Sequence, residues 1–84
     1  MEKQIGRVTH FFGHLNVAAV ELEGELKVGD TLHFKGHTSD WTQAVASMQI
    51  EHDSVDKAGP GDVIGMKVEG HAREHDLVFK IVED

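Results

Sequence analysis

Seven histidines in 84 residues are the first side chains of this chain that could do chemistry. His33 and His37 are four residues apart, and His71 and His75 repeat that spacing. On a helix, such a pair lies on one face and could chelate zinc. Neither pair lies in a stretch with helical periodicity, and Gly36 interrupts the first. We therefore expect solvated or core-edge histidines and no metal centre, and a metal-binding protein is the weakest of three functional hypotheses.

Catalytic groups are equally hard to find. The segments Glu51-His52-Asp53 and Glu74-His75-Asp76 carry suitable donors. Neighbouring side chains on a strand point to opposite faces, so neither segment converges on one point. The chain has no cysteine, no nucleophile-elbow motif and no paired carboxylates in a motif that would form an acid–base pocket. The sequence therefore predicts no catalytic residues and no enzyme activity.

Aromatic and basic side chains gather near the N-terminus. No acidic residue lies between Lys3 and Val20, although the chain is acidic elsewhere. Aromatic rings beside basic groups can stack on bases or pack against a protein. The predicted contact surface consists of Arg7, His10, Phe11, Phe12, His14 and Trp41. The alternative is that the three aromatic rings are buried plugs at the ends of the fold, although a regular strand cannot bury two adjacent phenylalanines in one core.

The net charge limits the possible partners. Eight Lys and Arg residues stand against 15 Asp and Glu residues, which gives a formal charge of −7. Phosphate backbones repel such a chain, so DNA and nonspecific nucleic-acid binding are disfavoured. Protonation of the histidines would cancel this charge, so RNA affinity, if present, should rise as the pH falls. The absence of cysteine is compatible with a reducing cytosol, and residues 1–20 contain no long apolar run, so we expect a cytoplasmic protein with no membrane contact.

Three turns punctuate the chain and share one pattern. Each ends in an aspartate that is followed by a β-type apolar run: Gly29-Asp30, Gly61-Asp62 and His75-Asp76. Glycine supplies the positive φ of a tight turn, and aspartate bonds the local backbone where a strand begins. We therefore predict that Gly29 and Gly61 occupy turn positions that have positive φ or leave no room for a side chain. His75 takes the place of the third glycine, at some steric cost.

Period-2 alternation of apolar residues predicts six strands. Four cover about residues 4–12, 15–22, 31–35 and 42–52, and the last two follow Asp62 and Asp76. Helix is the competing interpretation of residues 43–52, because Ala, Met and Gln favour helices, but the alternation of Ala44, Ala46, Met48 and Ile50 favours a strand. The predicted core contains Leu32, Phe34, Met48, Ile50, Ile64 and Met66. Short connections then predict an all-β fold, a small closed six-stranded antiparallel β-barrel that occupies residues 1–84 as a single domain.

Four segments carry a family resemblance. Residues 26–30 (LKVGD) resemble a K-V-G-D turn, and residues 45–50 (VASMQI) resemble a V-x-S-I/M-x strand. Residues 58–66 (AGPGDVIGM) and 72–78 (AREHDLV) are similar to A-x-x-G-D-x-V-G-L and I-R-x-G-D-V-V. These patterns occur in this order in the second domain of translational GTPases such as elongation factor Tu. The resemblance implies a barrel of the translation-factor domain II type, and it is closest to stand-alone, elongation-factor-like proteins.

The resemblance also implies a function. The chain has no G-x-x-x-x-G-K-S/T loop, so we expect no GTP binding and no cofactor. No tRNA-binding residue can be carried over, because the pocket residues are not recognisable. The expected function is a non-catalytic, translation-factor-like binding module that contacts RNA, tRNA or a ribosomal or other protein partner of the translation machinery. The alternative is a protein-interaction subunit of a larger complex with no RNA contact.

Overall fold

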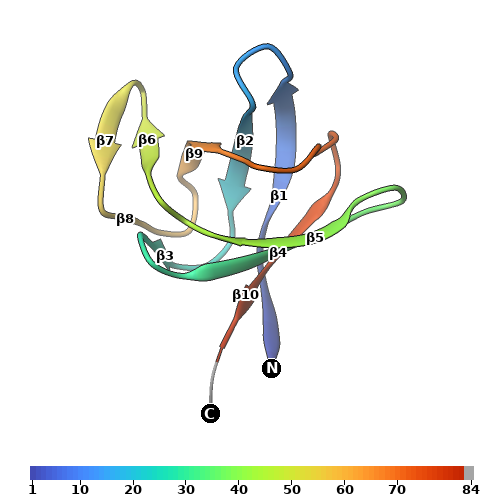
Figure 1. The fold of residues 1–84 in the computed structure, drawn as a ribbon. Helices are drawn as coiled ribbons and strands as arrows, with labels where there is room; N and C mark the ends of the chain where they lie inside the picture. The colour runs from blue at the N-terminus through green and yellow to red at the C-terminus, as the bar shows by residue number, and fades with distance from the viewer. Residues whose placement is uncertain (83–84) are drawn as a thin grey trace.

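The computed structural model describes residues 1–82, which form strands, turns and loops without a helix (Figure 1). The predicted all-β class is therefore confirmed. No helix in this part of the chain is long and apolar enough to cross a membrane. The strands are β1 (Glu2–Phe12), β2 (Val17–Leu22), β3 (Leu26–Lys27), β4 (Thr31–Lys35), β5 (Asp40–Ala44), β6 (Met48–Ile50), β7 (Asp53–Val55), β8 (Lys57–Ala58), β9 (Val63–Lys67) and β10 (Leu77–Ile81).

The closed six-stranded barrel predicted from the sequence is wrong. Eight strands form one sheet in the order β5-β4-β10-β1-β2-β9-β6-β7, and β5 and β7 are its two unjoined ends. Strands β3 and β8 pair separately. The reason lies in residues 42–52, which form two strands and not one. The segment 45–47 carries the chain from β5 at one end of the sheet to β6 near the other end (Figure 1).

The same break changes which residues face the core. Val45 leaves the strand geometry because its N–H and C=O bond the backbone of residues 29 and 30. Gln43, Val45 and Met48 are buried, whereas Ala44 and Ala46 are exposed. The predicted alternation is therefore wrong before residue 48. Ile50 is only half-buried, which corrects its assignment to the central core.

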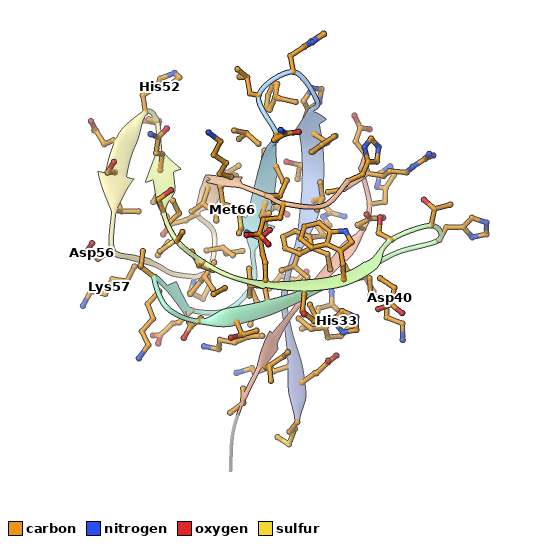
Figure 2. The ribbon with its side chains drawn as sticks, viewed as in Figure 1. His33, Asp40, His52, Asp56, Lys57 and Met66 are labelled. Atoms are coloured by element: carbon orange, nitrogen blue, oxygen red, sulfur yellow. The ribbon has the colours of Figure 1, made fainter. Side chains whose placement is uncertain are left out.

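The centre of the core was predicted correctly. Leu32, Phe34, Met48, Ile64 and Met66 are all at most 2% exposed. Figure 2 shows Met66 in the interior between the curved strands. In β10 the fully buried residue is Val78, while Leu77 faces solvent. The core also takes in Ile5, Val8, Ala18, Val20, Leu22, Leu26, Val45, Val68 and Ala72.

The three aspartate turns have one geometry. Gly29 and Gly61 adopt φ values of 100° and 92°, as predicted, and His75 adopts 75°. Each aspartate carboxylate accepts the backbone N–H three residues before it, and the aspartate N–H donates back to that residue's carbonyl at 3.1 Å. The carboxylate bonds run from Lys27 to Asp30 at 3.0 Å, from Gly59 to Asp62 at 2.9 Å, and from Arg73 to Asp76 at 2.9 Å. These closed turns fix where β4, β9 and β10 begin.

Candidate functional site: an apolar groove on the outer face of the sheet

An apolar groove of about 360 Å³ lies on the face of β1, β2, β9 and β6 that points away from the core. The outer face of an antiparallel sheet is usually polar. Here Phe12, Leu15 and Val63 are 44%, 63% and 49% exposed. Clustered exposed apolar side chains of this kind mark interaction surfaces. The groove is lined by Phe12, Leu15, Val17, Ala19, Gln49, Glu51, His52, Val63, Ile64 and Gly65.

Small residues form the floor of the groove. Ala19 pairs with Gly65 across β2 and β9, and Gly65 pairs with Gln49 across β9 and β6. Residues directly opposite on neighbouring strands share a face. A Cβ added at Gly65 would meet only Val17 Cγ1, at 3.6 Å, which is an ordinary contact. The fold therefore does not require glycine at this position, and its missing side chain keeps the groove open.

An irregularity in β1 turns Phe12 towards the groove. The register with β2 shifts between Val8 and His10. Such a bulge changes which faces the following residues point to. After it, Phe11 packs against the core and is partly buried, while Phe12 faces outward. The His10 and Phe12 rings lie 4.4 Å apart on this outer side.

The rim opposite Phe12 is a strained turn. Glu51 and His52 connect β6 to β7 with φ values of 49° and 72°. Two successive positive φ values are typical of a type I′ hairpin turn, where asparagine and glycine are the favoured residues. Strain of this kind gathers at binding and active sites. Figure 2 shows His52 at the tip of the hairpin.

The structure divides the six residues predicted to form the contact surface. Trp41 stacks on Phe34 at 4.3 Å and donates from Nε1 to the His71 carbonyl at 3.1 Å. The Phe11 ring lies 4.7 Å from the His71 ring. Phe11 and Trp41 therefore cover the core and do not share a face with Phe12.

The polar members of the predicted set are on the surface. Arg7 contacts Glu21 at 3.4 Å, and His10 Nδ1 lies 3.4 Å from the Glu74 carboxylate. His14 is exposed in the turn between β1 and β2. Only Phe12 of the six lines the groove. A ligand contact by any of the six stays a prediction.

Several groove residues were missed from the sequence. Val17 and Ala19 alternate with buried residues in β2, and this outward apolar pattern was a usable signal. Gly65 interrupts an apolar strand, which also indicates a special surface. Glu51 and His52 gave no signal, because the pair lacks the Asn-Gly or Asp-Gly pattern that marks a tight hairpin turn.

His33 has a raised pKa, and it lies outside the groove lining. Its Nδ1 is 2.8 Å from Glu2 Oε2, and its Nε2 bonds the Asp40 carboxylate (Figure 2). The hydrogen bond to Asp40 raises the pKa of His33 most strongly, burial opposes that effect, and Glu2 adds to it. The same bond lowers the pKa of Asp40. This trio ties β1, β4 and β5 together.

The carboxylates of that trio hold different ring nitrogens of His33, so the three side chains do not converge on one point. Within residues 1–82, no group of three or more His, Asp or Glu side chains is arranged to hold a metal ion. The surface that stands out is therefore the groove, whose lining suits an apolar contact.

This fold is that of a domain known from solved structures. The C-terminal domain of a "putative U32 peptidase" from Geobacillus thermoleovorans matches it with a TM-score of 0.89, over 95% of this chain and 93% of that one. The selenomethionine variant of the same domain matches with a TM-score of 0.86, over 90% of this chain and 96% of that one. The sequence identity is 20% in both cases, so the likeness shows the fold.

In sequence, the chain is similar to an uncharacterized protease of Methanocaldococcus jannaschii. The two are 40% identical over 81 residues, which are 95% of this chain and 20% of the protease. The chain thus spans about one fifth of the length of this curated relative. No model of a protein family matches the sequence.

These comparisons overturn the resemblance to translational GTPases. The similar proteins are a protease and the C-terminal domain of a U32 peptidase. The expected translation-factor-like function, with RNA, tRNA or ribosomal partners, is therefore wrong. Neither it nor its alternative, a subunit of a larger complex without RNA contact, anticipated a peptidase domain. Gly-Asp turns begin strands in many small β domains, so they carried less information than their order suggested.

Proposed function

We propose that this chain is an accessory domain that works with a catalytic body of the U32 peptidase type, on the same polypeptide or on a separate one. The observation that carries the proposal is the sequence match to a protease. The match has 40% identity and covers nearly all of this chain but only one fifth of the protease. The fold likeness to a C-terminal domain of a U32 peptidase supports the same assignment. Four fifths of the protease lie outside the matched segment. Catalysis by that larger part and an accessory role for the matched domain would fit this arrangement.

The proposed domain is non-catalytic by itself. Peptide hydrolysis by a protein nucleophile needs a hydroxyl, thiol or amine beside a base. The groove lining contains no Ser, Thr, Cys, Tyr or Lys. Its only titratable side chains are Glu51 and His52, which are adjacent residues on the exposed turn. Its chemistry therefore favours contact over catalysis.

The groove is the proposed contact surface with the catalytic body. Phe12, Leu15 and Val63 leave apolar area in water that a partner would bury, at about 25 cal/mol per Å². Glu51 gives the rim a negative charge, and the lining contains no Lys or Arg. The segment of the catalytic body that would fit this groove has an apolar side chain next to a basic one. The cytoplasmic location expected from the absence of cysteine remains part of the proposal.

A chimera tests this proposal. The matched 81 residues of the Methanocaldococcus jannaschii protease are replaced by this chain, and a second variant lacks them. We expect the chimera to keep the parent's melting temperature and its hydrolysis of a denatured protein substrate, whereas the deletion loses part of both. The isolated chain should not hydrolyse the substrate. A chimera that behaves like the deletion, or hydrolysis by the isolated chain, would refute the proposal.

A further inference from the structure

We propose that a second cleft, bordered by Lys27, Lys57 and Lys80, binds an oxyanion, either a carboxylate or a phosphate group. The cleft has a volume of about 460 Å³ and lies where the β3–β8 pair meets β10. The cleft and the apolar groove share no lining residue. This proposal does not depend on the proposed peptidase role and would stand if that role were refuted.

The first observation is a like-charged pair. Lys27 and Lys57 are direct partners across β3 and β8. Like charges at directly opposite positions of an antiparallel pair destabilise it. The chain has 15 acidic residues and only eight basic ones, so a carboxylate opposite a lysine would be the commoner pairing. An anion held between the two ammonium groups would remove the repulsion.

The second observation is that both lysines are available. Each is exposed, and within residues 1–82 neither side chain takes part in an ion pair or a side-chain hydrogen bond. Figure 2 shows Lys57 at the surface beside β8. An ammonium group is a compact point charge with three donors, which suits an oxyanion. The two side chains can therefore turn to one ligand without breaking a contact.

The third observation is that lysines outnumber the acidic residues of the cleft lining, Glu25 and Asp30, by three to two. Asp30 accepts the Lys27 backbone N–H at 3.0 Å and lies 3.9 Å from the Lys80 ammonium. Lys80 also donates to the Glu25 carbonyl at 3.0 Å. In the β1–β10 register Lys80 lies opposite Lys3. A fourth lysine therefore lies next to Lys80 in the sheet, although it does not line the cleft.

The shape of the cleft limits the ligand to a small group. Leu26 and Ala58 also line the cleft and add apolar atoms to it. The volume is that of roughly 15 water molecules at about 30 Å³ each. It therefore accommodates an oxyanion with a short aliphatic or phosphoryl body and some retained water. Lys27 and Lys57 would supply the positive charge that selects an anion, and Lys80 also lines the cleft.

Thermal unfolding with defined anions tests the inference. Wild type, Lys57→Gln and the control Lys67→Gln are melted at pH 7.5 in sodium chloride, inorganic phosphate or succinate at one ionic strength. Lys67 is exposed on β9 opposite Val17, away from the cleft. We expect phosphate, succinate or both to raise the melting temperature of wild type and the control above the chloride value. Lys57→Gln should weaken the apparent affinity by about tenfold or more.

The variant Lys57→Glu separates the site from a general salt effect. It replaces the repulsive pair by an attractive one, so at low salt it should melt above wild type and show no anion-specific response. A response to succinate alone assigns the site to carboxylates, and a response to phosphate alone assigns it to phosphates. Equal shifts in all four proteins would reflect exclusion of the salt from the surface and would overturn the site. Wild type that responds to neither anion would overturn it as well.

Discussion

Replacing the strained turn Glu51-His52 by Asn-Gly should make the domain more stable and weaken its proposed contact with the catalytic body. Both residues hold positive φ, 49° and 72°. The left-handed conformation costs an ordinary L-residue about 1–2 kcal/mol. Glycine escapes this cost but loses about 0.4–1 kcal/mol more conformational entropy on folding. Asparagine tolerates the conformation better than glutamate. The net gain for the pair is therefore about 1 kcal/mol.

The gain is measurable in a domain of this size. A change of 1 kcal/mol shifts the melting temperature of a domain of 60–100 residues by roughly 4–8 °C. Urea unfolding should show a higher midpoint with an unchanged slope. The Glu51 charge and the His52 ring leave the groove rim in the same variant. Titration calorimetry against the Methanocaldococcus jannaschii protease without its matched segment should then show weaker binding.

His75 provides the matched control. It has a φ of 75° in a turn whose backbone bonds glycine can make equally well, and it does not line the groove. His75→Gly should stabilise the domain by about half of the gain of the double variant and leave binding unchanged. Loss of stability in the double variant would refute the argument from strain. Stabilisation with unaltered binding would refute the role of the turn in the contact.

Four further substitutions test the core, a turn and the histidine network. Ile64→Ala should lower the free energy of unfolding in urea by about 2–5 kcal/mol, because Ile64 is fully buried. Ile50→Ala should cost clearly less, because Ile50 is half-buried. Equal costs would contradict the observed facing of β6. Gly61→Val should destabilise by more than about 1 kcal/mol although its surroundings are empty, because φ is 92°; a neutral change would show that the turn relaxes. The pKa of His33 is raised in the folded state, so its stabilising contribution is complete below the unfolded value near 6.5 and is lost as the pH rises through the folded value. His33→Asn should therefore flatten the fall in stability as the pH rises above about 6.5, and an unchanged slope would exclude this network as its source. The pKa of Asp40 is lowered, so its own contribution is lost only as the pH falls below about 4.

The sequence predicted the parts of this fold that local physics determines. The Gly-Asp turns need a residue that tolerates positive φ and a side chain that accepts a backbone N–H. Glycine and aspartate meet these two needs, so the turns are visible in the residue types. Strand β4 was placed at residues 31–35 because Leu32 and Phe34 alternate with polar neighbours. The buried residues of β9 were found in the same way. Each of these features needs only a few neighbouring residues.

The features that were missed depend on distant contacts. The break at 45–47 arises because Val45 bonds the backbone of residues 29 and 30, and nothing in the sequence VASMQI marks that pairing. One continuous strand was therefore expected, and with it a closed barrel. The facing of Phe11 and Phe12 depends on the bulge near His10, which likewise arises in the pairing of β1 with a distant strand, β2.

The candidate site was missed for a related reason. A groove between four strands is a property of their arrangement, whereas the sequence shows only the separate apolar positions. The aromatic residues drew attention because they are rare in this chain, at 6% of all residues. Two of the three singled out, Phe11 and Trp41, cover the core. The more informative outward positions are the small ones, Ala19 and Gly65.

Filling the groove would test directly whether it is the contact surface for the catalytic body. In Gly65→Leu the new side chain occupies the hollow, and its Cβ meets only an ordinary contact with Val17, so the fold should persist. Val28→Ser removes an exposed apolar side chain outside the groove lining and serves as the control. The measurement is the calorimetric affinity of the three chains for the Methanocaldococcus jannaschii protease without its matched segment. We predict that wild type and Val28→Ser bind alike and that Gly65→Leu binds at least about tenfold more weakly, a loss of about 1.4 kcal/mol. Undiminished binding by a correctly folded Gly65→Leu, or no binding by wild type, would contradict it.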